Sequence, residues 1–507
     1  MPDTIIPNSN LYALFASYFP VDRSATFLEH DRGTTTFDQL DEQSARIATV
    51  LKANGITKGD RVIAQVEKSP EAVVLYLACL RTGAVFVPLN TAYTISELAY
   101  FITDAGPRIV VCDPQAKTEI TGICAETTTV LTLDGTGGGS LIKQMNNATI
   151  DTEVIQNKGD DLAAILYTSG TTGRSKGAML THDNLASNAR VLHEYWQWQP
   201  DDVLLHALPI FHVHGLFVAL HCALLNGTKV IFHNRFDVNE IIKTLPNATV
   251  LMGVPTFYTR LLDAPDFTAG TCRNMRLFIS GSAPLLPETF TDFEQLTGHT
   301  ILERYGMTEA GMITSNPYDG SRIAGTVGFA LPGVTARVAN ANGVEVALGE
   351  VGILEIKGPN IFAGYWQMPK KTADEFREDG YFITGDMATM DTTGRVTIVG
   401  RTKDLIITGG YNVYPKEVEI EIDKISGIRE SAVVGIPHSD YGEAVTAIIV
   451  TDENVEIRED EVRAAISTRI AKFKQPIRLI FIPELPRNTM EKVQKSALRE
   501  AYADLYK

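Results

Sequence analysis

Helical patterns alternate with short β-branched runs along the first 150 residues of the chain. Amphipathic spacing predicts helices over residues 37–51 and 71–80, and the β-branched runs predict strands over 59–66, 84–88 and 109–112. Because helices and strands take turns, we expect an α/β fold with a largely parallel sheet. A further apolar run, Leu162–Leu166, is long enough for one buried strand.

The pattern changes near residue 400. Strands predicted over residues 431–436 and 444–450, and a helix over 458–471, form an α+β unit of ordinary domain size. At 507 residues the chain is too long for a single hydrophobic core. We therefore expect a large N-terminal domain of layered sheets and helices over 1–402 and a small α+β domain over 403–507.

Composition narrows the class of protein. With 44% hydrophobic and 21% charged residues, the chain is typical of a globular protein. Its formal net charge of −16 argues against general binding to nucleic acid or to anionic membranes. The longest clear apolar run, residues 72–80, is too short to span a bilayer, and the N-terminus has no signal-peptide pattern. Five scattered cysteines are typical of buried, reduced thiols, so we expect a cytoplasmic protein. The net charge and the short apolar runs together predict no membrane or nucleic-acid partner.

One loop offers chemistry for a polyphosphate. Tyr167-Thr-Ser-Gly-Thr-Thr-Gly-Arg-Ser-Lys-Gly177 follows the apolar run directly and combines glycines, hydroxyls and one lysine. Glycines let backbone N–H groups approach an anion, hydroxyls donate to phosphate oxygens, and the lysine adds charge. The spacing is not that of a Walker loop. The alternative is a flexible surface turn. The candidate phosphate-binding residues are Thr168, Ser169, Gly170, Thr171, Thr172, Gly173 and Lys176.

Two later strand ends carry candidate nucleotide-binding residues. At the first, a flat ring has room to pack against Gly281, Ser282 and Ala283. At the second, Tyr305 offers an aromatic face and Thr308 a hydroxyl for phosphate. The neighbouring Glu309 is suited to Mg²⁺, which needs only one or two carboxylates beside phosphate oxygens. Further along, Asp386 is predicted to close a strand and to accept two ribose hydroxyls; its alternative role is capping a turn.

These motifs, taken in order, resemble those of the adenylate-forming superfamily, which includes acyl- and aryl-CoA synthetases, peptide-synthetase adenylation domains and beetle luciferases. The resemblance covers nearly the whole chain. It implies ATP, Mg²⁺ and coenzyme A as cofactors, and a small-molecule carboxylic acid as substrate. An acyl-adenylate forms first, and a thiol then displaces AMP. The resemblance also adds Glu303 to the nucleotide site, and it places His212 where the acid and the thiol tunnel meet. The alternative for the His212-Val-His214 pair, a metal site, lacks nearby acidic or cysteine ligands.

The resemblance also assigns roles in the C-terminal domain. It implies a hinge at Lys403, ribose and phosphate contacts from Arg401, and a backbone at Gly410 that lies against pantetheine. It makes Lys492 the lysine that acts in adenylation and a target for a lysine acyltransferase and deacylase. Here the sequence departs from the family, because Glu491 stands where a glycine is usual. That carboxylate would raise the pKa of the lysine and bring negative charge towards ATP, and a non-glycine residue is restricted if the position needs a positive φ.

Within the superfamily the chain most resembles malonyl-CoA synthetases, through residues 211–217, 253–261 and 308–319. Methylmalonate adds only a methyl group, so it is expected to be tolerated. A dicarboxylate must bury a second charge, which requires a cation. Arg260 is the first candidate and Arg235 the second, with Ser280 and Met307 completing the acid pocket. If Arg260 is only a solvated charge, a short-chain or aryl-CoA ligase is the alternative. An adenylation-impaired binding protein, compromised by Glu491, is the alternative from another class.

Overall fold

The computed structural model describes residues 8–168, 175–452, 455, 457–488 and 491–506. The chain divides into two compact units, Met1–Thr335 with Lys357–Gly380 and Ala336–Ile356 with Tyr381–Lys507. The predicted domain boundary between residues 402 and 403 falls inside the second unit and stays a prediction. The mixed α/β architecture, with a large N-terminal part and a small C-terminal part, is confirmed.

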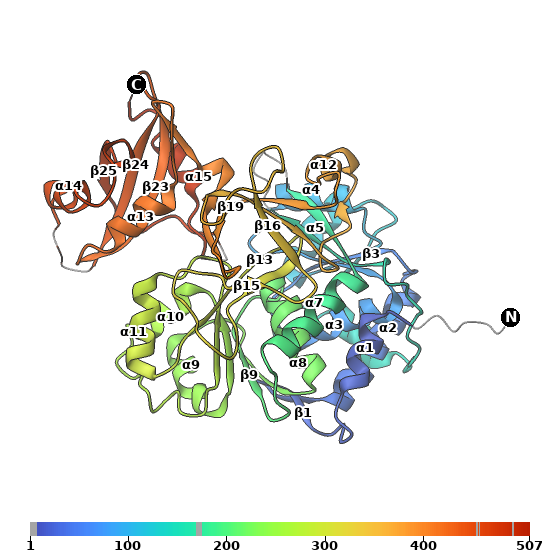
Figure 1. Ribbon diagram of the computed structural model, residues 1–507. Coiled ribbons are helices and arrows are strands. Elements are labelled where there is room, and N and C mark those ends of the chain that lie inside the picture. The colour runs from blue at the N-terminus through green and yellow to red at the C-terminus, as the bar shows by residue number, and fades with distance from the viewer. Residues whose placement is uncertain (1–7, 169–174, 453–454, 456, 489–490, 507) are drawn as a thin grey trace. The chain divides into compact units, whose positions relative to one another are not determined.

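The first unit contains two large sheets (Figure 1). In spatial order, the nine-stranded sheet consists of β15 (Phe329–Ala330), β14 (Gly311–Ser315), β13 (Leu302–Met307), β12 (Leu277–Ser280), β11 (Val250–Gly253), β9 (Val203–His206), β10 (Lys229–Phe232), β1 (Thr26–His30) and β2 (Gly33–Thr36). The seven-stranded sheet consists of β18 (Gly364–Tyr365), β8 (Lys176–Thr181), β7 (Leu162–Thr168), β4 (Val85–Pro88), β3 (Arg61–Gln65), β5 (Ile109–Cys112) and β6 (Thr129–Thr132). Strands β3 to β7 pair in parallel, as predicted, whereas β8 runs antiparallel to β7.

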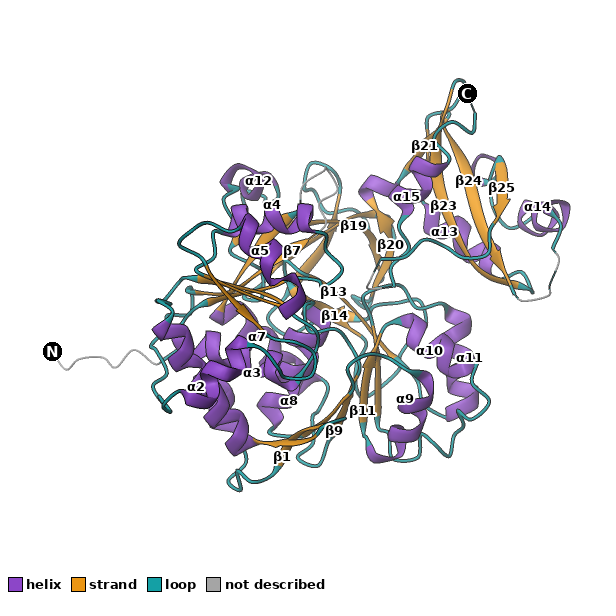
Figure 2. Ribbon diagram, turned by 180° about the vertical axis from the view of Figure 1, so that it is seen from behind, coloured by secondary structure: helices purple, strands orange, loops and turns teal. Residues whose placement is uncertain are grey.

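Helices separate and cover these sheets (Figure 2). The inner layer consists of α1 (Leu11–Tyr18), α2 (Phe37–Ala53), α3 (Pro70–Thr82), α7 (His182–Tyr195), the π-helix η2 (His214–Leu220) and α8 (His221–Asn226). The outer helices on the nine-stranded sheet are α9 (Val238–Thr244), α10 (Pro255–Leu262) and α11 (Pro287–Thr297). The remaining helices of the unit are α4 (Ile95–Ala105), η1 (Pro114–Ala116), α5 (Lys117–Ile123), α6 (Ser140–Asn147), η3 (Leu245–Asn247) and α12 (Pro369–Asp374).

Local sequence explains the ends of the inner helices. Helix α2 begins with a capping box, in which the Thr36 hydroxyl accepts from the Gln39 N–H at 3.2 Å and the Gln39 side chain accepts from the Thr36 N–H at 2.9 Å. Helix α3 begins at the Ser69 cap and ends at Gly83, whose φ of +66° favours glycine. Twelve of the thirteen α3 residues are buried, all except Glu71, which accounts for the nearly continuous apolar sequence of this helix.

The second unit contains a four-stranded sheet and a five-stranded sheet. The first consists of β16 (Thr335–Ala339), β17 (Gly352–Lys357), β19 (Phe382–Met390) and β20 (Val396–Arg401). The second consists of β22 (Tyr411–Val413), β21 (Ile406–Thr408), β24 (Gly442–Thr451), β23 (Ile428–His438) and β25 (Arg478–Phe481). Its helices are η4 (Thr402–Asp404), α13 (Pro415–Asp423), α14 (Glu459–Ser467), η5 (Lys472–Lys474) and α15 (Lys495–Ala501).

The predicted elements exist, and their ends differ in places. Asp386 lies inside β19 instead of closing it, because β19 continues to Met390 in a ladder with β20. Helix α14 ends at Ser467, four residues before its predicted end. All five cysteines are free thiols, and four of them are buried. Among the described residues, the structure has no helix with both the length and the apolar sequence needed to cross a membrane.

Candidate functional site

The predicted phosphate loop connects two paired strands. Thr168 ends β7 and Lys176 begins β8, and the two are cross-strand partners in the antiparallel ladder. The buried strand β7 and the six-residue β8 therefore hold both ends of the loop. The predicted phosphate ligands Ser169, Gly170, Thr171, Thr172 and Gly173 lie outside the described residues.

Lys176 joins a cluster that includes the predicted metal ligand Glu309. The Lys176 Nζ lies 3.2 Å from Glu375 Oε1 and 4.2 Å from the centre of the Tyr365 ring. The Tyr365 hydroxyl lies 3.0 Å from Glu309 Oε1 and 2.7 Å from Glu375 Oε2. A second lysine, Lys371, contacts Glu375 at 2.7 Å. The phosphate-loop lysine and the candidate metal carboxylate are thus linked through one tyrosine.

Burial shapes the charges in this cluster. Glu309 is 6% exposed, and burial raises the pKa of its carboxyl above the ordinary value. Burial also opposes ionisation of Glu375, but hydrogen bonds from Lys371 and Tyr365 and the charge of Lys176 outweigh it and lower the pKa of Glu375. A buried carboxylate with a raised pKa gains most from a nearby cation, so Glu309 fits a hard cation bound together with phosphate. The described residues contain no group of three or more His, Cys, Asp or Glu side chains arranged for a metal, including around His212 and His214.

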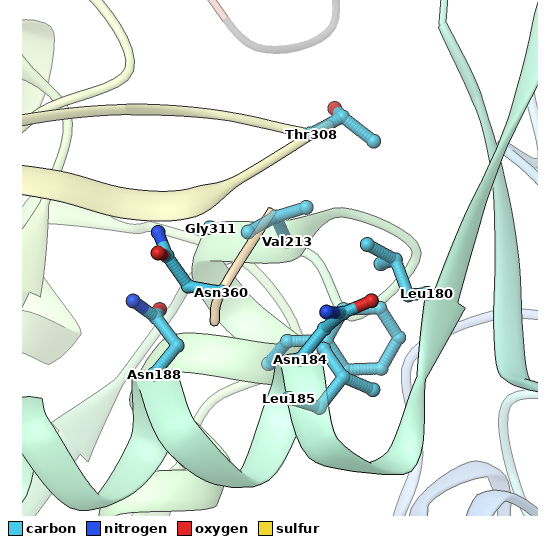
Figure 3. Close-up of a pocket in the computed structure, with 9 residues that line it drawn as sticks. Leu180, Asn184, Leu185, Asn188, Val213, Thr308, Gly311 and Asn360 are labelled. Atoms are coloured by element: carbon cyan, nitrogen blue, oxygen red, sulfur yellow. The ribbon is translucent and has the colours of Figure 1, made fainter. Parts of the chain in front are cut away.

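Two asparagines hold the turn that carries Thr308 and Glu309. Asn188 on α7 donates to the Met312 carbonyl at 2.8 Å and accepts from the Met312 N–H at 3.0 Å. Asn360 donates to the Ala310 carbonyl at 2.7 Å. Figure 3 shows both asparagines and Thr308 around a small cavity. The Phe362 N–H also donates to the Glu309 carbonyl at 2.8 Å, so the segment from Asn360 to Tyr365 supports the turn from one side.

The small-residue turn after β12 packs against the planar guanidinium of Arg304. A Cβ atom on Gly281 would lie 2.3 Å from Cζ of Arg304, so only glycine allows the Arg304 guanidinium to lie there. Ser282 adopts a φ of +73°, and its hydroxyl lies 3.3 Å from His214 Nδ1. Ala283 is half-buried in the same turn. The structure thus explains why position 281 is a glycine, which the local sequence alone does not.

The neighbouring predicted residues lie on adjacent strand ends. Ser280 and Glu303 are buried, and they are cross-strand partners between β12 and β13. Tyr305 and Met307 follow on β13, half-buried. His212 is half-buried just before η2. Ligands of open α/β sheets bind at the carboxyl ends of parallel strands, and β11, β12 and β13 end here.

The predicted substrate cations are exposed. Arg260 belongs to the last turn of α10, not to its first turns as predicted, and its side chain is exposed. Arg235 is exposed in the segment between β10 and α9. Neither arginine is buried in the way that a desolvated second carboxylate requires.

The second unit brings two predicted ribose ligands together. Asp386 and Arg401 are cross-strand partners, and Arg401 Nε lies 3.0 Å from Asp386 Oδ1. Asp386 is 4% exposed. Gly409 and Gly410 form the turn between β21 and β22 with φ of +55° and +83°. Burial, followed by the charge of Arg401, lowers the pKa of the predicted hinge residue Lys403.

Lys492 lies in a tight turn. Arg487 and Val493 pair as an antiparallel bridge, and the Asn488 side chain accepts from the Lys492 N–H at 3.0 Å. Glu491 in this turn has a φ of +58°, so the position does need the left-handed conformation in which glycine is favoured. A non-glycine residue in that region is strained by about 1 kcal/mol. The predicted conflict between Glu491 and its backbone is therefore real.

We expect Glu491→Gly to raise the adenylation rate by up to about tenfold. The substitution removes the strain and also a negative charge next to Lys492, the lysine expected to act in adenylation; two unit charges a few ångströms apart in water interact by about 1 kcal/mol. ATP–pyrophosphate exchange measures the rate. Glu491→Gln removes the charge and keeps the strain, so it separates the two causes. A wild-type rate equal to or above that of Glu491→Gly would contradict this expectation.

Several residues of the site have no strong signal in the sequence. Tyr365 and Glu375 lie in or near the Gly358–Trp366 motif, which suggested no role for either. Asn188 and Asn360 donate to backbone carbonyls of residues that are distant in the sequence, and only the fold brings these groups together. Arg304 was visible in the 302–310 motif but adjoins residues with more obvious chemistry.

Comparison with known proteins gives consistent matches. The chain matches the family described as AMP-binding enzyme over residues 15–366 and the AMP-binding enzyme C-terminal domain over 417–492. It is 36% identical to the malonate–CoA ligase of Arabidopsis thaliana, over 88% of this chain and 79% of that protein. It is 32% identical to a feruloyl-CoA synthase of an Amycolatopsis species, over 94% and 96% respectively. Among solved structures, ATP-bound MatB from Rhodopseudomonas palustris is 55% identical, with a TM-score of 0.97 over 99% of this chain and 100% of that chain.

Proposed function

Because the chain belongs to the AMP-binding enzyme family, we propose that it joins malonate, and also methylmalonate, to coenzyme A through an acyl-adenylate, with ATP converted to AMP and pyrophosphate. This makes it an AMP-forming acid–thiol ligase. The observation that carries the proposal is the likeness to a malonate–CoA ligase at 36% identity over 88% of the chain and to MatB at 55% identity over 99% of the chain.

In the first half-reaction, a malonate carboxylate oxygen attacks the α-phosphorus of ATP, and pyrophosphate leaves. Such displacement depends on positioning and charge stabilisation. Thr168, Lys176 and Thr308 supply hydroxyl and ammonium donors for the phosphates, together with the loop between Thr168 and Lys176. Lys492 stabilises the negative charge that develops between the carboxylate and the α-phosphate.

Glu309 is the residue that would hold Mg²⁺, which neutralises phosphate charge when bound. The fit rests on its burial and raised pKa, and on the Tyr365 hydroxyl, which lies 3.0 Å from one carboxylate oxygen. The nucleotide itself is assigned to Gly281, Ser282, Ala283, Glu303 and Tyr305, with Asp386 and Arg401 on the ribose. The Asp386–Arg401 ion pair supports a shared role for these two side chains.

In the second half-reaction, the thiol of coenzyme A attacks the acyl carbon, and AMP leaves. Gly410 supplies a backbone without a side chain for the pantetheine arm, and the positive φ of Gly409 and Gly410 supports this assignment. His212 borders the point where acid and thiol meet. Lys492 and Gly410 serve successive steps, so we assign the change between them to rotation at Lys403.

The charge of Lys492 also offers a point of control. Acetylation removes that charge, so a lysine acyltransferase would switch adenylation off and a deacylase would restore it. The five free thiols support a reducing, cytoplasmic setting.

Oxygen transfer tests the acyl-adenylate route. With [¹⁸O]malonate, ATP and coenzyme A, one labelled oxygen should appear in AMP, because the attacking carboxylate oxygen stays on the α-phosphate when the thiol displaces AMP. Label in AMP together with malonyl-CoA by mass spectrometry supports the proposal. Thioester without label in AMP rejects the mechanism. If neither labelled AMP nor a thioester forms with any acid tested, the protein is better described as an adenylation-impaired binding protein.

A further inference from the structure

A buried lysine joins the two large sheets of the first unit. Lys68 lies between β3 and α3 and is 8% exposed. Burial lowers the pKa of Lys68, and no carboxylate among the described residues offsets this effect. Its Nζ donates to His206 Nδ1 at 2.8 Å, to the His206 carbonyl at 3.0 Å and to the His233 carbonyl. Since His206 ends β9 and His233 follows β10, a side chain from the segment after β3 is held at the carboxyl ends of two strands of the nine-stranded sheet.

The contact with Lys68 determines which nitrogen of His206 carries the proton. Nδ1 accepts from the lysine, so the proton lies on Nε2, which donates to the Gly215 carbonyl at 2.9 Å. Burial, and next the charge of Lys68, lower the pKa of His206, so the imidazole is neutral. The ring also stacks on Phe232, with ring centres 5.5 Å apart. Lys68 therefore fixes both the tautomer and the orientation of His206.

The hydrogen bond from His206 to Gly215 closes the segment that carries His212. Gly215 is the second residue of the π-helix η2, and π-helical turns occur frequently at functional sites. A Cβ atom on Gly215 would lie 2.1 Å from the Pro209 carbonyl oxygen, so the segment folds back closely on itself. The Leu216 N–H donates to the His212 carbonyl at 3.1 Å. His212 thus lies on a short segment whose two ends are tied together through His206.

We infer that Lys68 is a positioning residue for His212: through His206, it holds the His212 segment in the arrangement that thioester formation requires. The inference rests on the proposed function, in which His212 borders the point where acid and thiol meet. Within the described chain, the hydrogen bonds of Lys68 go to His206 and His233 and not to Lys176 or Glu309. Loss of Lys68 should therefore affect the attack of the thiol more than adenylation. This role also gives a reason for a buried lysine, which is otherwise costly to fold.

The test compares the two half-reactions in Lys68→Met, which keeps an unbranched side chain and removes the donors. Thioester formation from synthetic malonyl-adenylate and coenzyme A should fall by about 10- to 100-fold, because a displacement of about 1 Å can cost about 100-fold in rate. Malonate-dependent ATP–pyrophosphate exchange should fall much less, so the ratio of the two rates drops. Arg81→Met is the matched control, since Arg81 is a buried cation on α3 that pairs with Asp41. It should lower Tm and leave the ratio unchanged.

A double-mutant cycle shows whether Lys68 acts through His206. His206→Phe keeps a flat ring and removes both nitrogens, so it should reproduce the loss in thioester formation. Adding Lys68→Met to His206→Phe should then change the rate little, because residues that act as one unit are not additive. His206→Gln keeps an N–H donor near the position of Nε2 and should recover part of the lost rate. The two His206 variants test the inference even if Lys68→Met does not fold.

Several results would overturn the inference. Equal losses in the two half-reactions of Lys68→Met would leave Lys68 with a structural role alone, and a larger loss in exchange would assign it to adenylation. Additive effects of Lys68→Met and His206→Phe would show that the lysine acts independently of His206. A full rate of thioester formation in His206→Phe would also contradict the inference. If the wild type forms no thioester with any acid, the proposed function itself has failed, whereas an active wild type with an unchanged ratio in the variants rejects only the role of Lys68.

Discussion

Lys492→Gln should lower malonate-dependent ATP–pyrophosphate exchange by about 10² to 10³-fold. Removing one preorganised group that stabilises charge in a transition state has an effect of this size. The glutamine keeps most of the side-chain length and removes the charge, so it also imitates acetylated Lys492.

Two measurements separate a catalytic effect from a folding defect. Thioester formation from synthetic malonyl-adenylate and coenzyme A should persist in Lys492→Gln, since this step follows the one in which the lysine acts. Lys424→Gln, on an exposed lysine of the same unit that contacts Glu421 at 2.6 Å, should retain full exchange activity. Full exchange activity in Lys492→Gln would remove both the catalytic and the regulatory roles proposed for this lysine.

Glu309→Gln should lower adenylation by about 10² to 10³-fold and raise the Mg²⁺ concentration needed for half-maximal rate. The amide keeps the shape of the side chain and still accepts a hydrogen bond from Tyr365, so the turn should stay folded. What the variant loses is the negative charge, which a hard cation requires. Titration of the initial rate with Mg²⁺ measures the change.

The pH profile gives an independent check on Glu309. Its pKa is raised by burial, so the carboxylate becomes protonated, and activity falls, at a higher pH than for an ordinary glutamate. This acid limb should be present in the wild type and absent from the residual activity of Glu309→Gln. Glu375→Gln serves as the matched variant, since it alters the other carboxylate in contact with Tyr365, and its Mg²⁺ requirement should change less. A larger change in the Mg²⁺ requirement of Glu375→Gln than of Glu309→Gln would assign the metal to Glu375 instead of Glu309.

Periodicity predicted much of the fold because it reports burial directly. Strand β5 was predicted at its observed bounds, and α2 within two residues. The end of β19 was missed because strand length depends on pairing with β20, which the local sequence does not encode. The order of the strands in each sheet also depends on long-range pairing.

The candidate site likewise contains residues that the local sequence suggests and residues whose contacts depend on the fold. Residues whose chemistry is local, such as Thr308, Glu309 and Lys176, are candidates that their motifs alone suggest. Tyr365, Asn188 and Arg304 act through neighbours distant in the chain or buried in the fold, so their importance appears only in three dimensions. For Glu491 the sequence and the structure agree. The sequence has glutamate where glycine is usual, and the structure gives this residue a φ of +58°, in the region that favours glycine.

A competition assay among carboxylic acids tests whether the protein prefers a dicarboxylic acid. The wild-type protein is given ATP, Mg²⁺ and coenzyme A with equal concentrations of malonate, methylmalonate, acetate and coumarate, and the thioesters are separated by chromatography. We expect malonyl-CoA to be the main product, methylmalonyl-CoA to form as well, and acetyl-CoA to be lower by up to about 10⁴-fold. Predominance of acetyl-CoA or coumaroyl-CoA would contradict the assignment of a dicarboxylic acid substrate.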